Sequence, residues 1–166
     1  MLEPLARADR LDVLRDLLVG RRCWTTETVL AELNRGVADH PLLRNVSGQE
    51  WLLVAGLDSV AEIRLYDNWL KRVGTVGRDQ GEASVFATAE RQGATAITDD
   101  RRAAKVARFY GLDVHGTIWL LAAACREGKF TPAGASSLID ALRATGHRLP
   151  CTGLEFSGYA RQHGLL

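Results

Sequence analysis

The chain has 166 residues, 46% of them hydrophobic and 25% charged, so its composition is that of one folded domain with a sizeable core. Its net charge of +1 produces no overall field that would indicate a nucleic-acid partner, and its longest apolar run, residues 118–125, is too short to span a bilayer. Charged residues near the N-terminus exclude the apolar core of a signal peptide, so we expect a cytoplasmic protein without a membrane anchor.

Helices and short strands alternate in the predicted element order. The first half of the chain predicts helices over 5–19, 26–35 and 59–73, a strand over 22–24, loop or irregular helix over 37–50, and a buried strand over 51–57. Thr25 is the expected N-cap of the helix over 26–35, which ends at Gly36. The second half predicts helices over 81–92, 101–110, 117–127 and 132–145, with strands over 94–98 and 112–115. This alternation favours a three-layer α/β fold with a parallel sheet, formed by residues 1–150 and followed by an irregular tail, 151–166.

Glu82 lies where a helix should meet the core. In the stretch GEASVFATAERQG the apolar stripe runs through Val85, Phe86 and Ala89, and Glu82 is in the middle of it. Asp79 and Glu82 also fit a capping box, an interpretation that we favour for Asp79. A capping box does not require a place on the apolar stripe, so Glu82 is a candidate site residue.

Two further positions place acids at the same edge of the predicted sheet. Asp99 and Asp100 directly follow the strand over 94–98, and ligands of such sheets bind beyond the carboxyl ends of the strands. Either aspartate could instead be the N-cap of the helix that begins at Arg101. Glu32 flanks the apolar face of a helix that also follows a strand, so it can reach this edge.

Carboxylates that lie close together repel each other unless a cation offsets their charge. Mg²⁺ and Mn²⁺ prefer such hard oxygen ligands, whereas the four histidines are scattered without the spacing of a zinc site. A metal held by acids can activate water and neutralise charge on a phosphate, which is the chemistry of phosphodiester hydrolysis.

The segment over 79–121 resembles the PIN-domain nucleases. It contains D-x-G-E-A, then a strand that ends in D-D, then G-L-x-V-x-G-T, and the helix TTETVLAELNRG is similar to the family's second acidic segment. The resemblance extends over about residues 5–149. It implies a Rossmann-like α/β/α fold with a central parallel sheet, a Mg²⁺ or Mn²⁺ site, and single-stranded or structured RNA as substrate. It also implies kinship with VapC-like toxins, which pair with a small antitoxin, and we expect a homodimer.

The resemblance assigns roles to particular residues. By this match Glu32, Glu82 and Asp100 are the catalytic and metal-binding acids, Asp99 is an accessory or alternate ligand, and Thr98 is the small polar residue beside the site. Basic residues on the following helix, Arg101, Arg102, Lys105 and Arg108, are candidate contacts to RNA phosphates. A solvated charged helix explains any one of them equally well.

The family's first strand, which is central in its sheet and ends in an aspartate, has no counterpart here. The first predicted helix begins almost at Met1, and Asp9 and Asp12 lie inside its pattern. Either the start codon has been placed too late or the chain is a degenerate family member. We favour a strand and an aspartate encoded upstream, because a sheet without its central strand leaves backbone groups unpaired.

Three functions remain open at this point. The first is a metal-dependent, toxin-like endoribonuclease. The second is a catalytically degenerate PIN-like domain that binds RNA or a protein partner without cleavage. The third, a nucleotide-binding or receiver-like domain, has less support because the chain lacks a glycine-rich phosphate loop.

Overall fold

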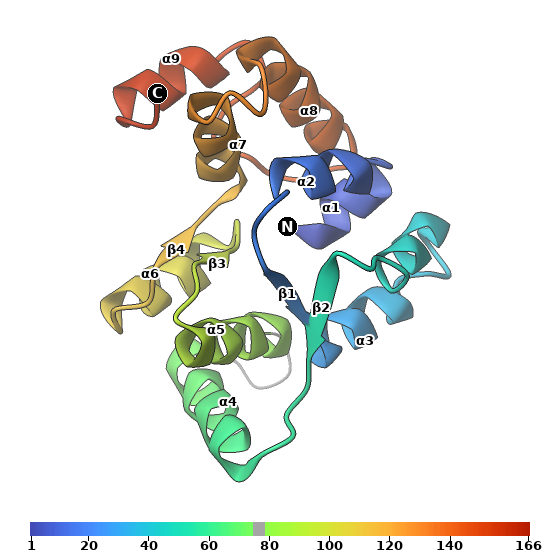
Figure 1. The fold of residues 1–166 in the computed structure, drawn as a ribbon, viewed down its shortest axis with the longest axis vertical. Coiled ribbons are helices and arrows are strands. Elements are labelled where there is room, and N and C mark those ends of the chain that lie inside the picture. The colour runs from blue at the N-terminus through green and yellow to red at the C-terminus, as the bar shows by residue number, and fades with distance from the viewer. Residues whose placement is uncertain (75–78) are drawn as a thin grey trace. The chain divides into compact units, whose positions relative to one another are not determined.

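A computed structural model describes residues 1–74 and 79–166 (Figure 1). Along the chain its elements are α1 (Leu2–Arg7), α2 (Leu11–Leu17), β1 (Cys23–Thr26), α3 (Glu27–Arg35), the 3-10 helix η1 (Pro41–Val46), β2 (Leu52–Ala55), α4 (Val60–Val73), α5 (Gln80–Gln92), β3 (Ala96–Ile97), α6 (Arg101–Phe109), β4 (Val114–His115), α7 (Thr117–Arg126), α8 (Pro132–Ala144) and α9 (Phe156–Gln162). They form two compact units, residues 22–115 and residues 1–21 with 116–166. None of the helices in the described residues is long and apolar enough to cross a membrane.

The strands of the 22–115 unit pair in parallel. β1 pairs with β2, with Cys23 opposite Leu52, and β3 pairs with β4, with Ala96 opposite Val114. The expected α/β fold with parallel strands is therefore confirmed. Among the described residues, however, the strands form two two-stranded sheets in place of a single central sheet.

β3 and β4 are shorter than the sequence predicted, because the residues before them complete helix ends. The amide of Ala94 donates to the carbonyl of Ala89, and the amide of Leu112 donates to the carbonyl of Ala107. These bonds close the last turns of α5 and α6. The amides that make them are not available to a strand ladder, so each strand begins about two residues later.

The core of this unit is built from two aromatic rings and many alanines. Trp69 of α4 and Phe86 of α5 are almost fully buried, with their ring centroids 5.3 Å apart in an edge-to-face arrangement. Small buried side chains on α6, such as Ala103 and Ala107, belong to the same cluster. They let the helices approach closely, so α5, which carries Glu82, is fixed by its neighbours.

The structure corrects three local predictions. The helix expected over 5–19 is interrupted, because Asp9 has a left-handed backbone (φ 54°), which aspartate tolerates better than most residues. The N-cap of α3 is Thr26 in place of Thr25, since β1 continues through Thr26 before the helix begins. β2 is a strand but not a buried one, because Leu53 and Val54 are 42% and 50% exposed.

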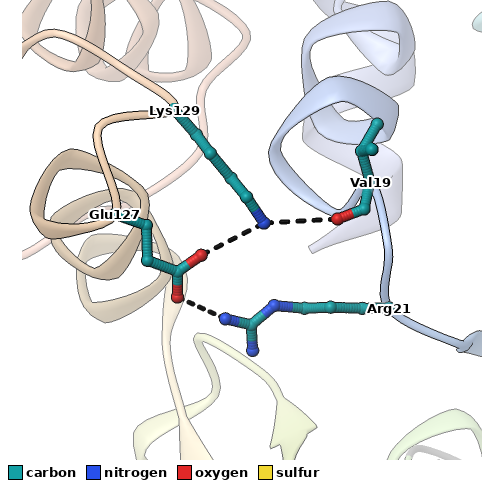
Figure 2. Close-up of polar contacts among 4 residues, drawn as sticks. All are labelled: Val19, Arg21, Glu127 and Lys129. Carbon is teal, nitrogen blue, oxygen red and sulfur yellow. Dashed lines mark hydrogen bonds and ion pairs between the residues drawn. The ribbon is translucent and has the colours of Figure 1, made fainter.

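In the other unit, ionic contacts tie the N-terminal segment to the end of α7 (Figure 2). The guanidinium of Arg21 pairs with the carboxylate of Glu127, whose second oxygen lies 3.1 Å from the ammonium of Lys129. Lys129 also donates a hydrogen bond to the carbonyl of Val19. The contact with Lys129 above all, together with the charge of Arg21, holds the pKa of Glu127 below its usual range.

Residues 151–166 are not the irregular tail expected from the sequence. They contain α9, whose Phe156 and Ala160 are fully buried. The amide of Gly153 donates to the carboxylate of Asp140 on α8 (2.8 Å). This segment is therefore packed and anchored, because its buried side chains and a side-chain acceptor offset the cost of ordering it.

Candidate functional site

The three principal acids predicted from the sequence all lie in the 22–115 unit, on segments around α5. Glu32 is on α3, Glu82 is in the first turn of α5, and Asp100 directly precedes α6. α5 itself contacts α3, β1 and β3. It is therefore the element that brings the acidic segments into one neighbourhood.

Glu32 is held against the start of α5. Its Oε1 accepts a hydrogen bond from the backbone N–H of Gly81 (3.1 Å), one of the amides that a helix start leaves without an intrahelical partner. A Cβ placed on Gly81 would lie only 2.4 Å from Oε2 of Glu32. The glycine of the D-x-G-E-A motif is therefore what leaves room for the Glu32 carboxylate.

Two buried hydroxyls connect the start of α3 to the same turn of α5. Ser84 Oγ donates to the carbonyl of Gly81 (2.8 Å) and lies 2.7 Å from Thr26 Oγ1. Thr26 Oγ1 in turn accepts from the amide of Val29, which caps α3. Both side chains are almost fully buried, so this chain of hydrogen bonds fixes α3 and α5 relative to each other.

Glu82 is half-buried beside fully buried residues of α5, including Ala83 and Phe86. Burial raises the pKa of its carboxyl above the usual range, and the charges of Glu32 and Asp100 raise it further, while a hydrogen bond from its own backbone opposes them. The carboxylates of Glu32 and Asp100 thus lie close enough to Glu82 for their charges to act on it.

Asp100 is the N-cap of α6, which was one of the two alternatives left open for the D-D pair. Its Oδ1 accepts from the amide of Ala103 (2.7 Å). Its own amide donates to Oγ1 of Thr98 (3.2 Å), so the buried hydroxyl of Thr98 shapes the turn between β3 and α6. Asp99 lies between them and is partly exposed.

The capping box predicted for Asp79 is wrong. Asp79 precedes α5, but its backbone (φ −110°, ψ 28°) is not the extended one of a capping residue, and its side chain makes no capping hydrogen bond to a described residue. Its Oδ2 instead accepts from the guanidinium of Arg102 (2.8 Å).

The basic residues of α6 fall into two groups. Arg101 and Lys105 are exposed to solvent. Arg102 and Arg108 bind other parts of the protein, because Arg102 contacts Asp79 and the guanidinium of Arg108 donates twice to the carbonyl of Val114 (3.0 and 2.9 Å). The helix therefore offers Arg101 and Lys105 most readily to an external anion.

The acids suit a divalent cation in chemical type. Their carboxylate oxygens are hard ligands of the kind that Mg²⁺ and Mn²⁺ prefer, and the repulsion that Glu32 and Asp100 exert on Glu82 is what such a cation would relieve. Within residues 1–74 and 79–166, no group of three or more His, Cys, Asp or Glu side chains is gathered closely enough to hold a metal ion. The acids are of the right chemical type for such a cation, but in the described residues their side chains are not gathered around one metal position.

Sequence reasoning did not predict three contributors to this neighbourhood. Gly81 and Ser84 lie in the quoted motif, but nothing local indicates that they would contact Glu32 and Thr26 from another helix. Tyr66 of α4 is the third: burial raises the pKa of its phenol, and the charge of Glu32 raises it further. Its only sequence signal is its place in a helix.

Fold and site together define an α/β protein with parallel strands, two carboxylates at helix starts, and a third, that of Glu32, hydrogen-bonded to one of those starts. A family model for the PIN domain matches residues 1–155, so the chain belongs to the PIN domain family. PIN domains are in general nucleases, hydrolases that generally use divalent metal ions. No curated protein and no solved structure matches the chain significantly.

Proposed function

We propose that the protein is a Mg²⁺- or Mn²⁺-dependent endoribonuclease that hydrolyses phosphodiester bonds of single-stranded or structured RNA. The observation that carries the proposal is the placement of Glu32, Glu82 and Asp100 around the start of α5, where burial and neighbouring charge act on Glu82. Membership in a family of nucleases supports the reaction type.

Glu32, Glu82 and Asp100 would hold the metal ion, with Asp99 as an accessory ligand. When bound, the ion supplies Lewis-acid chemistry, because it activates water and neutralises charge that builds on the phosphate. The protein's own contribution is to orient these acids: the Gly81 amide holds Glu32, and the Ala103 amide holds Asp100. Fixed carboxylates need little reorganisation when the reaction begins.

The substrate would bind along α6. Arg101 and Lys105 are exposed and lie one and five residues after Asp100, where they can contact RNA phosphates on either side of the scissile bond. Thr98 lies at the small polar position before the acids, and its hydroxyl shapes the turn that presents Asp100.

The test is cleavage of a mixed RNA pool in Mg²⁺ or Mn²⁺, with and without EDTA. We expect EDTA to stop cleavage and Glu82→Gln to abolish it, because the amide keeps the shape of the side chain but loses its charge. Glu27→Gln is the matched control, since Glu27 is an exposed acid on the same helix as Glu32. Cleavage that survives both EDTA and Glu82→Gln would rule the proposal out.

One observation favours a second candidate function, a PIN-like domain that binds RNA or a protein partner without cleavage. The acids are not gathered into a ligand cluster among the described residues. Salt-dependent RNA binding with no cleavage in either metal would select this alternative.

We further propose a cytoplasmic, toxin-like role in which a small antitoxin protein neutralises a homodimeric nuclease. The support is kinship within the PIN domain family. Expression should then arrest growth in the wild type but not in Glu82→Gln, and light scattering should give twice the chain's 18.2 kDa mass. Normal growth, or a monomer at all concentrations, would contradict these parts of the proposal.

A further inference from the structure

Arg102 bridges two helix ends that are separate in the sequence. Its Nη2 donates one hydrogen bond to the backbone carbonyl of Val73, the last residue of α4, and another to Oδ2 of Asp79 (2.8 Å), which directly precedes α5. One side chain of α6 therefore holds both the end of α4 and the start of α5.

The Arg102 bridge connects α6, which begins after Asp100, with the start of α5, which carries Glu82 and binds Glu32. Asp79 is three residues before Glu82 and two before Gly81, whose amide holds Glu32. Arg102 itself is two residues after Asp100, in the first turn of α6. Any shift of α5 relative to α6 would thus change the separation of Glu82 and Asp100.

We propose that Arg102 is a positioning residue of the acidic site and not a phosphate ligand. This inference rests on the proposed nuclease function, which gives the site its purpose. Through Asp79 and the carbonyl of Val73, the guanidinium sets where the first turn of α5 lies relative to Asp100, and Glu32 follows because it is bound to Gly81.

The exposure of the two partners makes this role separable from folding. The side chain of Arg102 is 61% exposed, although that of Asp79 is only 19% exposed, and water can solvate Asp79 from the space that the guanidinium leaves, so the loss of this ion pair should cost little stability. Removing the guanidinium should therefore leave the protein folded while the acids shift. Groups that hydrogen-bond to metal ligands typically change metal affinity or activity by about 10- to 100-fold when they are removed, and Arg102 acts one contact further out, through Asp79 and Val73.

The experiment compares Arg102→Ala, Arg102→Lys and Arg101→Ala. We expect Arg102→Ala to weaken Mn²⁺ binding and to lower kcat by about 10-fold, the low end of that range, with an unchanged KM for RNA. Arg102→Lys should restore part of both, because an ammonium can still donate to two acceptors. Arg101→Ala should do the reverse: KM rises, the salt dependence of RNA binding becomes shallower, and Mn²⁺ affinity is unchanged.

A readout without metal or RNA separates this inference from the proposed function. The NMR resonance of the Gly81 amide reports its hydrogen bond to Glu32, and Glu32→Ala identifies the shift of the free amide. We expect Arg102→Ala to move the Gly81 resonance towards that value. If it does not move, or if Arg102→Ala raises KM and leaves Mn²⁺ affinity unchanged, the inference is wrong. A wild type that neither binds Mn²⁺ nor cleaves RNA refutes the proposed function, and the Gly81 resonance still decides the role of Arg102.

Discussion

Replacing Gly81 by alanine should separate the stability of the protein from the integrity of its acidic site. The new Cβ would lie 2.4 Å from Oε2 of Glu32, whereas ordinary contacts of this kind begin at 3.4 Å. The carboxylate must therefore withdraw by about 1 Å. It can do so without a backbone shift, because it is the far end of a flexible side chain.

Two opposing effects leave the folding free energy of Gly81→Ala close to that of the wild type. Alanine in place of a helical glycine stabilises by up to about 1 kcal/mol. Loss of the hydrogen bond from the Gly81 amide to Glu32 costs about 1 kcal/mol, less than the loss of a bond to a fully buried charged group, because the carboxylate is only partly buried. Misplacing a reacting or ligating group by 1 Å, in contrast, can reduce the rate about 100-fold.

The assay is thermal unfolding measured beside Mn²⁺ binding and RNA cleavage. Gly158→Ala is the matched control, because Gly158 is also helical and, apart from its chain neighbours and the backbone of its own helix, no described atom lies within 4 Å of its added Cβ. We expect both variants to unfold within a few degrees of the wild type, but only Gly81→Ala to lose metal affinity and cleavage. Full activity in Gly81→Ala would refute the reasoning, since Glu32 could then not be needed at its place against Gly81.

Three further predictions concern single side chains. Burial and neighbouring charges raise the pKa of Glu82 in the folded protein, so its contribution to stability is lost as pH rises from the unfolded-state pKa to the folded-state pKa. In EDTA, Glu82→Gln should therefore be more stable than the wild type at pH 7, and the difference should disappear in acid. Equal urea midpoints of the two proteins at pH 7 would contradict this. Ser84→Ala should cost about 1–3 kcal/mol in urea unfolding, because it deprives the buried Thr26 hydroxyl of its acceptor; a loss below about 0.5 kcal/mol would count against that network. Lys105→Ala should make the plot of log RNA-binding constant against log salt concentration shallower by about 0.7, without changing the melting temperature. An unchanged slope would exclude Lys105 as a phosphate contact.

Helices with clear local signals were predictable from the sequence to within one or two residues. α4 was expected over 59–73, and it has Ser59 as its N-cap and ends before Gly74, which adopts the left-handed backbone that glycine favours. The interrupted first helix was not predictable, because the apolar spacing continues across Asp9 while the backbone turns there. The exposure of Leu53 and Val54 was also missed, since an apolar run does not reveal how much of a strand its neighbours cover.

The same distinction applies to the site. Glu82 was identified because a carboxylate in an apolar stripe conflicts with local pattern, and the structure leaves it half-buried beside other acids. The role of Asp79 was misassigned because its partner, Arg102, is 23 residues away, and capping motifs consider only neighbouring amides. Contacts between helices, such as that of Glu32 with Gly81, depend on packing that no local spacing encodes.

The hydrogen bonds of the acids also bear on which cation the site would accept. Oε1 of Glu32 is held by the amide of Gly81, and Oδ1 of Asp100 by the amide of Ala103. Each carboxylate therefore has one oxygen engaged and would offer a cation its other oxygen. Ca²⁺ needs six to eight oxygen ligands and often takes carboxylates through both oxygens, whereas Mg²⁺ takes six ligands in near-ideal octahedral geometry and keeps several waters, so it needs few oxygens from each carboxylate. We therefore expect Mg²⁺ or Mn²⁺ to support RNA cleavage and Ca²⁺ to fail at equal concentration. Equal cleavage rates in Ca²⁺ and Mg²⁺ would show that the engaged oxygens are released on metal binding, contrary to this expectation.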